Sequence, residues 1–291
     1  MSISGRTLSV FRNYSTALSK AEKHVPQALT SEFYEHIRHQ VYGDSKKVDK
    51  VVVKILKEEK EIPVLVNRNV STPYQCLSHI SKHFADDGIL VDVVPSVGSS
   101  FISSMNQPIQ DQSTIRKIAF DSDELTAMLN EVYWRSCSLL TAAMLKDALS
   151  DSFDFKINNK QVQDGYFSLN VSGLKGIPFS SEELQTINRF AKTYISDEKS
   201  FECLHVPSSI AKENNLKGSQ LVRIKNHVFD ANGPVIRSTS QIGRYSIVNS
   251  KQSGSDSVAV CGVSLPVYQP TSSYSWTLIA KNAAQKFIKN T

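Results

Sequence analysis

Residues 124–149 read ELTAMLNEVYWRSCSLLTAAMLKDAL, and the prediction of the fold starts from this stretch. It contains no glycine or proline and is rich in alanine, leucine and methionine, so we expect one long helix. Its most apolar run, residues 139–145, is followed by Lys146 and Asp147. A membrane-spanning helix needs about eighteen apolar residues, so this helix is expected to lie in the core of a soluble protein.

The overall composition is that of an ordinary globular protein. The chain has 291 residues, of which 40% are hydrophobic and 21% are charged, and this length leaves room for two small cores. Basic residues number 33 and acidic residues 28, giving a formal charge of +5. This excess is mild compared with dedicated nucleic-acid-binding domains, so any contact with nucleic acid is expected to be local.

Several catalytic and metal-binding motifs are missing from the sequence. The four cysteines, at positions 76, 137, 203 and 261, lie far apart without a C-x-x-C pair. They predict reduced, half-buried thiols, and they encode neither a zinc ribbon nor a disulfide scaffold. No phosphate-binding G-x-x-x-x-G-K-[ST] loop occurs, and Pro266 replaces the second glycine that a G-x-S-x-G nucleophile elbow needs around Ser264.

The centre of the long helix, YWRSCSLL at 133–140, resembles the helix that carries a His-x-x-x-His pair in threonyl-tRNA synthetase editing domains. A second stretch, FDANGPV at 229–235, resembles the Cys-x-Gly-Pro-His element of the same domain. The four reactive positions hold Arg135, Leu139, Ala231 and Val235. The resemblance implies that these positions converge, so we expect Leu139 and Val235 to pack together.

These replacements remove the chemistry of the editing site. Leucine, valine and alanine have no lone pair, and arginine stays protonated at neutral pH. We therefore expect no zinc, no other cofactor, no small-molecule substrate and no catalytic residue at the lost editing positions.

The N-terminal segment has the composition of a mitochondrial transit peptide. Residues 1–20 contain Arg6, Arg12 and Lys20 and many hydroxyl side chains, with no acid before Glu22. We expect cleavage after Tyr14, which makes 1–14 the leader. A basic tail that stays attached is the alternative. Residues 15–50 are expected to form a helical lead, with a helix over 27–43, and a charged linker.

Residues 51–120 are expected to form the first domain. Two β-rich runs, at 51–56 and 62–66, flank the charged turn KEEKE and predict a hairpin. A helix is expected from Pro73 to about Phe84, and short strands follow. This segment resembles the TGS domain that precedes the editing domain in threonyl-tRNA synthetases, chiefly at VNRNVSTPYQC, 66–76. The resemblance implies a β-grasp fold.

Residues 121–291 are expected to form an editing-like domain of mixed sheet and helices that ends in a C-terminal helix. Ser180 and Glu183 form a predicted capping box for a helix over 181–195. Strands are expected at 163–171, 201–206 and 221–229, and a short helix at 207–214. The remaining runs RYSIVN, SVAVCGVSLPVY and SYSWTLI also predict strands, followed by a basic helix over 280–289. The fold class is therefore α+β.

The chain also resembles the family of mitochondrial large-subunit ribosomal proteins numbered thirty-nine, through NRNVSTPYQC, VYWRSC and CGVSLPV. The resemblance implies a structural, non-catalytic part of the large subunit in the mitochondrial matrix, with ribosomal RNA and ribosomal proteins as partners and no membrane span. Two alternatives stay open: a free-standing deacylase of mischarged tRNA, and an RNA-binding regulatory module.

The basic residues are scattered along the chain, and most are expected to be solvated. A few are candidates for contacts with RNA or protein. They are Lys46, Lys47, Arg68, Arg237, Arg244, Lys281, Lys286 and Lys289.

Overall fold

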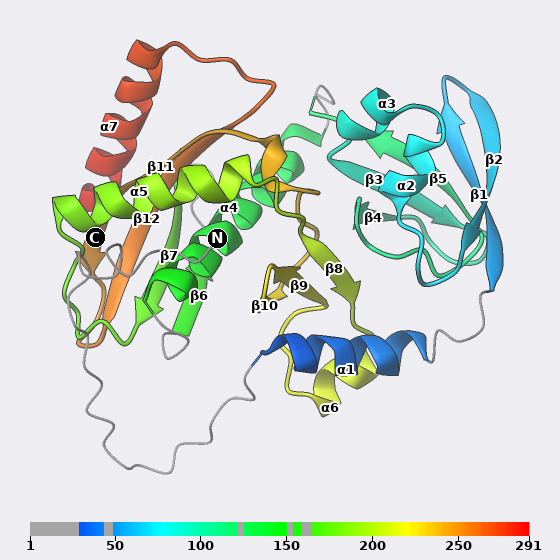
Figure 1. Ribbon diagram of the computed structural model, residues 1–291, viewed down its shortest axis with the longest axis horizontal. Coiled ribbons are helices and arrows are strands. Elements are labelled where there is room, and N and C mark those ends of the chain that lie inside the picture. Colours follow the sequence, from blue (N-terminus) through cyan, green and yellow to red (C-terminus); the bar gives the residue numbers. More distant parts are fainter. Residues whose placement is uncertain (1–28, 44–48, 121–124, 150–153, 159–164, 291) are drawn as a thin grey trace. The chain divides into compact units, whose positions relative to one another are not determined.

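The computed structural model describes residues 29–43, 49–120, 125–149, 154–158 and 165–290. The expected leader, 1–14, and the linker residues Lys46 and Lys47 lie outside the described residues. Within them, helices accompany a five-stranded, a three-stranded and a four-stranded sheet (Figure 1). The protein therefore has a mixed α+β fold, as the sequence predicts. Among the described residues, no helix is both long and apolar enough to cross a membrane.

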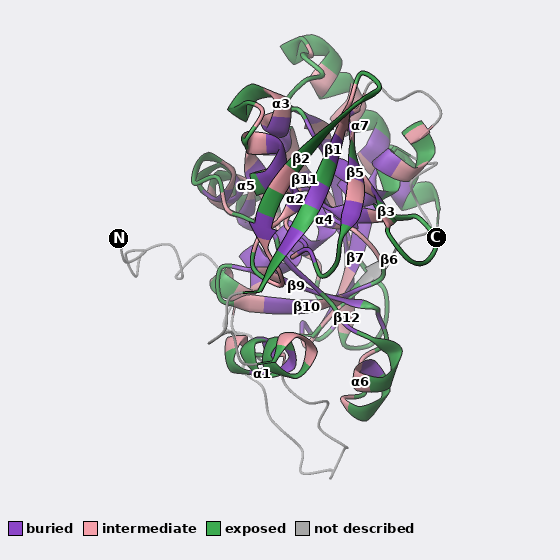
Figure 2. Ribbon diagram, turned by 90° about the vertical axis from the view of Figure 1, so that its right-hand side faces the viewer, coloured by how far each residue is buried: buried purple, intermediate pink, exposed green. Residues whose placement is uncertain are grey.

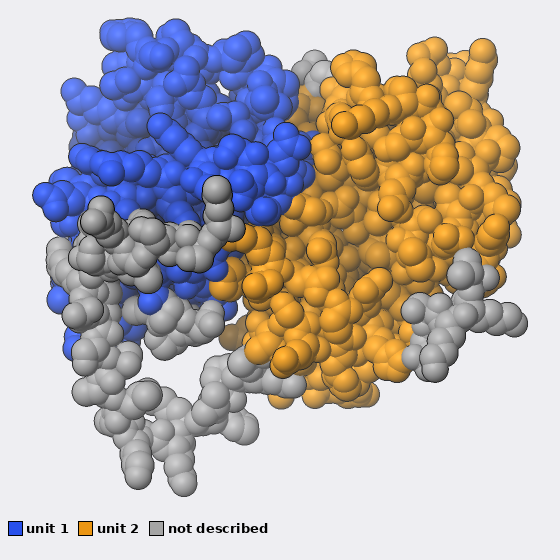
Figure 3. Space-filling view, in the orientation of Figure 1, with its two compact units in different colours: residues 1–25, 133–199, 238–291 blue, residues 26–132, 200–237 orange. Residues whose placement is uncertain are grey.

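The chain folds into two compact units (Figure 3). Among the described residues, unit 1 contains those within Tyr133–Lys199 and Ser238–Thr291. Unit 2 contains Pro26–Val132 and Ser200–Arg237. The expected division of the chain into a domain at 51–120 and a domain at 121–291 stays a prediction.

The five-stranded sheet of unit 2 begins with the predicted hairpin of β1, Lys50–Lys57, and β2, Lys60–Asn67. Its two-residue turn places Glu58 and Glu59 at φ of 48° and 66°, as the twist of a tight hairpin requires. Buried and exposed residues alternate along most of β1, so one face of the strand contributes to the core (Figure 2).

The sheet is completed by three further strands in the order β2-β1-β5-β3-β4. They are β3, Leu90–Pro95, β4, Phe101–Ser104, and β5, Ser113–Ile118. Strand β5 runs parallel to β1, whereas β3 is antiparallel to both of its neighbours. A parallel pair requires a crossover connection, which here contains the helices and β3.

The helix expected from Pro73 to about Phe84 is wrong as a single element. The structure has α2, Pro73–Ser78, and α3, Lys82–Asp86. Thr72 caps α2 in a reciprocal capping box with Gln75, and Ser81 caps α3 by accepting from the Phe84 amide. Because Ser81 offers the backbone an acceptor outside the helix, a second helix starts there and the first one ends.

Unit 2 also contains α1, Ser31–Tyr42, and a sheet ordered β10-β9-β8. The strands are β8, Glu202–His205, β9, Gln220–Ile224, and β10, His227–Ala231, and α6, Ser208–Glu213, lies between β8 and β9. The single strand expected at 221–229 is therefore wrong. Lys225, at φ 54°, turns the chain into a hairpin of two strands.

Unit 1 holds most of the long helix α4, Thr126–Ala148, and a sheet ordered β11-β12-β7-β6. The strands are β6, Asp154–Asn158, β7, Phe167–Ser172, β11, Ile242–Gln252, and β12, Ser257–Pro266. Helix α5, Ser181–Ser196, and α7, Ser273–Lys289, also belong to this unit, and the 3-10 turn η4, Thr239–Gln241, precedes β11. All strand pairs in the sheet are antiparallel.

The strand expected at SYSWTLI is wrong, because these residues form the first turns of α7. Ser272 caps the helix by accepting a hydrogen bond from the Ser275 amide. Trp276 and Ala280, one turn apart, pack against the same core cluster. Tertiary packing at helical spacing outweighs the weak preference of the aromatic residues for strands.

The capping box at the start of α5 is present as the sequence predicts. The Glu183 amide donates to Ser180 Oγ at 3.3 Å, and the Ser180 amide donates to Glu183 Oε2 at 2.7 Å. We expect Ser180→Ala to lower stability by about 1 kcal/mol, because a first-turn N–H loses its acceptor. Thermal melts of the full chain measure this. The matched control is Ser181→Ala, an exposed serine one residue further on, and an equal loss in both variants would contradict the capping role.

Gly262 is required by a close cross-strand contact. It pairs with Phe167 on β7, and a Cβ atom at Gly262 would lie 2.2 Å from the Phe167 ring. We expect Gly262→Ala to cost about 1–3 kcal/mol through overpacking. Urea unfolding of Gly262→Ala, Phe167→Leu and the double variant tests the cause. In the double variant the two losses should be less than additive, and strictly additive losses would exclude the ring clash.

Candidate functional site

Arg135 and Leu139, two of the four positions that the resemblance matches to the editing motif, lie one turn apart on α4. Leu139 is fully buried, whereas Arg135 is half-buried. The residues from Ser136 to Leu145 are all buried, so this part of α4 is enclosed on every side. A helix buried all round acts as the centre of a core.

Aromatic rings fill the space beside this part of α4. The Trp134 ring lies 5.5 Å from the Phe167 ring, which lies 5.8 Å from the Tyr245 ring, measured between centroids. The Tyr245 hydroxyl is 2.5 Å from Thr141 Oγ1, which donates to the Cys137 carbonyl. Burial raises the pKa of Tyr245 well above its ordinary value. The phenol therefore stays neutral and acts as a structural group.

Tyr133 and Ser264 form a second buried polar contact in unit 1. Their hydroxyl oxygens are 2.7 Å apart, and Ser264 Oγ donates to the Arg244 carbonyl at 2.7 Å. Ser264 lies within β12 and is only 3% exposed, in agreement with the absence of a nucleophile elbow at this serine. Burial raises the pKa of Tyr133. The serine satisfies a carbonyl and does not present a nucleophile to solvent.

The other two lost positions are also buried, in unit 2. Ala231 ends β10 and is 3% exposed, and Val235 is fully buried. The Val235 amide donates to Ser104 Oγ at 2.9 Å, and Gln220 Nε2 approaches the same oxygen at 3.4 Å. Ser104 of β4 therefore satisfies the buried Val235 amide within the fold.

The backbone around Ala231 is equally tight. The amides of Lys217 and Gly218 donate to the Asp230 carboxylate at 2.6 and 2.8 Å. A Cβ atom at Gly218 would lie 2.4 Å from the Ala231 carbonyl oxygen, so only glycine permits this approach. By accepting both amide hydrogen bonds, the Asp230 carboxylate holds the loop at residues 217–218 in place.

The structure places Arg135 and Leu139 in unit 1, and Ala231 and Val235 in unit 2. The expected packing of Leu139 against Val235 stays a prediction. Among the described residues, no three or more His, Cys, Asp or Glu side chains gather as metal ligands would. His79 and His83, one turn apart in the expected helix, belong instead to the end of α2 and to α3.

The candidate arginines have partners within the protein. Arg68 lies 3.2 Å from Asp49 and 3.5 Å from Asp111. Arg237 is 3.2 Å from Asp86, and its guanidinium carbon stacks 4.4 Å from the Tyr74 ring centre. Arg244 donates to the Thr271 carbonyl at 3.0 Å. Each of these arginines therefore has a structural role, whatever else it contacts.

The candidate lysines of the C-terminal segment differ from the arginines in their exposure. Lys281, Lys286 and Lys289 are all exposed residues of α7. An exposed ammonium group loses little hydration when it meets an anionic partner.

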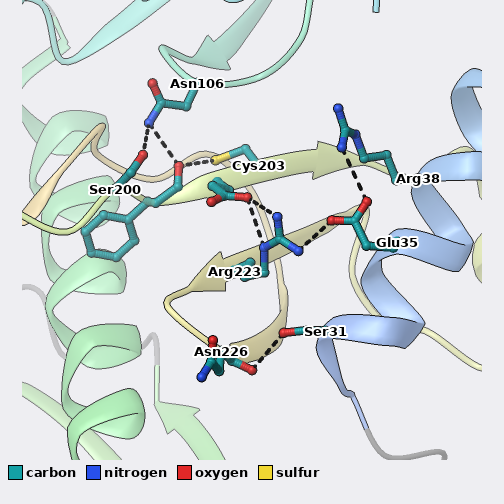
Figure 4. A network of polar contacts seen from close by, with 10 residues as sticks. Ser31, Glu35, Arg38, Asn106, Ser200, Cys203, Arg223 and Asn226 are labelled. Atoms are coloured by element: carbon teal, nitrogen blue, oxygen red, sulfur yellow. Dashed lines mark hydrogen bonds and ion pairs between the residues drawn. The ribbon is translucent and has the colours of Figure 1, made fainter. Parts of the chain in front are cut away.

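Unit 2 contains an ion network that the sequence analysis does not predict (Figure 4). Arg223 on β9 donates to Glu35 of α1 at 2.6 Å and, through Nε, to Glu202 of β8 at 2.9 Å. Burial raises the pKa of the Glu35 carboxyl, but the Arg223 hydrogen bond and charge outweigh it and hold the pKa below its ordinary value. Glu35 and Arg223 are 188 positions apart, so no local pattern links them.

Asn106 forms a second long-range connection in unit 2. Its side-chain amide donates to Ser200 Oγ at 2.9 Å, the Phe201 carbonyl at 3.1 Å and the Arg237 carbonyl at 2.9 Å. It lies just after β4 and thus joins the five-stranded sheet to the segment 200–237. An asparagine that follows a strand gives no sequence signal of this role.

The cysteines are more deeply buried than the sequence predicts, because all four are buried and not half-buried. Burial raises the pKa of Cys76, Cys137, Cys203 and Cys261 from about 9 to about 12. A thiol held neutral is a poor nucleophile and a poor metal ligand.

The buried thiols predict a loss of stability at alkaline pH. Above about pH 8.5 the unfolded thiols ionise, whereas the folded thiols stay neutral up to about pH 12, so ionisation favours the unfolded state across this window. We expect the urea midpoint to fall between pH 8 and about 10. A Cys137→Ala variant should show a shallower fall. Equal slopes in both proteins would contradict the thiol contribution.

Comparisons with known proteins find partial similarity to two kinds of protein. No protein-family model matches the chain. It is 23% identical to large ribosomal subunit protein mL39 of Drosophila melanogaster, over 68% of this chain and 64% of that protein. It is 24% identical to cytoplasmic threonine–tRNA ligase 2 of Xenopus tropicalis and 26% identical to that of Mus musculus.

The two ligase matches cover 55% and 47% of this chain but only 18% and 15% of the ligases. The chain thus spans less than two thirds of the ribosomal relative and less than a fifth of each ligase. The resemblance carried by the sequence motifs is confirmed: the chain is similar both to large ribosomal subunit protein mL39 and to a part of threonyl-tRNA synthetases.

Proposed function

We propose that this protein is a structural, non-catalytic component of the mitochondrial large ribosomal subunit. The observation that carries the proposal is the similarity to large ribosomal subunit protein mL39 over 68% of the chain. Its neighbours would be large-subunit ribosomal RNA and other mitochondrial ribosomal proteins, in the mitochondrial matrix. In this role the protein supports mitochondrial translation by its shape and its surface contacts.

The chemistry of the lost editing positions supports a non-catalytic role. Leu139, Ala231 and Val235 are buried and offer no lone pair to a metal or a proton. Arg135 stays protonated and cannot act as a general base at neutral pH. The surrounding hydroxyl groups of Tyr133, Thr141 and Ser264 are hydrogen-bonded within the fold. The degenerate site would therefore act as a packed core.

We further propose that the five-stranded sheet is a TGS-like β-grasp and that residues 121–291 derive from an editing domain. In support, a hairpin of β1 and β2 is followed by helices α2 and α3, and β5 runs parallel beside β1. The partial similarity to threonyl-tRNA synthetases also favours this origin. The leader over 1–14, cleaved after Tyr14, is part of the same proposal.

The proposal predicts how the protein sediments. In a sucrose gradient of mitochondrial lysate at low salt, the tagged chain should travel with the large subunit and the monosome. When magnesium is chelated, monosomes separate into subunits, and the chain should then follow the large subunit alone. Rising salt should release it gradually, because cations replace phosphate contacts. A tagged soluble matrix enzyme of similar size serves as the control and should stay at the top.

Three results would contradict the ribosomal role or its packed site. A chain found mainly at the top of the gradient, free or with tRNA, would favour the regulatory module or the deacylase. Hydrolysis of mischarged threonine tRNA by the purified chain, lost in Arg135→Ala, would identify the deacylase. Stoichiometric zinc in the purified protein would likewise oppose a packed, metal-free site.

A further inference from the structure

One face of α7 is firmly anchored to the sheet of unit 1. The helix lies along β11 and β12 (Figure 1), and Ala283 and Phe287 are nearly fully buried against this sheet. The Phe287 ring meets the Tyr166 ring edge-on at 5.7 Å. Lys251 of β11 donates to the Phe287 carbonyl at 2.6 Å, near the C-terminal end of the helix. These contacts fix α7 without using its outer face.

The outer face carries a second apolar stripe. Tyr274 is 75% exposed, Leu278 is 41% exposed and Ile288 is 57% exposed. Together with Lys281 and Gln285, both exposed, they follow the spacing i, i+4, i+7, i+11 and i+14. This is the a and d spacing of a helix–helix seam, and it spans about 21 Å at 1.5 Å per residue. We call these five residues the outer stripe.

The charged residues of α7 itself have one sign. Residues 257–291 contain no aspartate or glutamate and three lysines, all of them on α7. At 100° per residue, Lys281 lies within the stripe, and Lys289 and Lys286 lie successively further round to one side of it. The stripe thus presents the apolar side chains of Tyr274, Leu278 and Ile288 beside lysines, which is complementary to an apolar seam with an acidic border.

We propose that the outer stripe of α7 docks an amphipathic helix of a neighbouring protein, whose apolar seam is flanked by aspartate or glutamate. Tyr274, Leu278 and Ile288 would pack into that seam as side chains do in coiled coils. The lysines would face the acidic border and select the register. The inference rests on the proposed function for its setting, because it names the kind of protein neighbour that this surface fits.

Other occupants fit the stripe less well. A second copy of the chain would place lysines opposite lysines, since the segment has no acid. The N-terminal segment of the chain is also basic, with no acid in residues 1–21. RNA phosphates would use the lysines, but they would gain nothing from Leu278 and Ile288. An acidic amphipathic helix uses both kinds of side chain.

The test uses the full chain and a synthetic helical peptide of about three heptads, with leucine at a and d and glutamate at e and g. Fluorescence anisotropy should show binding of this peptide. The double variant Leu278→Gln, Ile288→Gln should weaken binding at least about tenfold. The matched control is Val97→Gln, because Val97 is 92% exposed and lies in unit 2. This variant should bind the peptide with unchanged affinity. Thermal melts confirm that each variant is folded.

Charge reversal tests the selectivity of the surface. A second peptide with lysine in place of glutamate should bind the native chain weakly and should bind Lys281→Glu better than the first peptide does. Binding insensitive to the stripe substitutions, a preference for single-stranded RNA, or stripe-dependent self-association in sedimentation velocity would each overturn the proposal. These measurements need no ribosome, so their failure and a failure of the gradient experiment are distinguishable.

Discussion

The complete burial of α4 between Ser136 and Leu145 is the constraint on which unit 1 depends. A helix enclosed on all sides must satisfy its polar groups internally. Ser138 donates to the Trp134 carbonyl and Thr141 to the Cys137 carbonyl, and Thr141 also meets Tyr245. This part of α4 therefore acts as the centre of the core of unit 1.

Unit 2 is held together by contacts between segments far apart in the chain. Arg223 links α1 to β8 through Glu35 and Glu202, and it stacks 4.5 Å from the Tyr34 ring. Arg237 connects the segment after β10 to α3 through Asp86. Guanidinium groups suit this role, because a planar fork can hydrogen-bond and stack at once. The contacts of Arg223 and Arg237 therefore hold distant segments of unit 2 together.

The basic residues of the protein bear on the proposed structural role. Among the candidate residues that the structure describes, the three lysines of α7 are exposed. A ribosomal neighbour binds through shape and distributed contacts, which tolerate the loss of a catalytic group but need a stable fold. The partial similarity to threonyl-tRNA synthetases and to a ribosomal protein is consistent with such a stable fold in the proposed structural role.

The sequence by itself determined the features that depend on near neighbours: the β1–β2 hairpin and the capping box at Ser180. It also indicated the long helix. Only the tertiary structure decided that residues 273–279 are helical and that Glu35 meets Arg223. Local patterns report propensity and spacing, whereas these outcomes are set by contacts between residues distant in sequence, whose free energy exceeds the propensities.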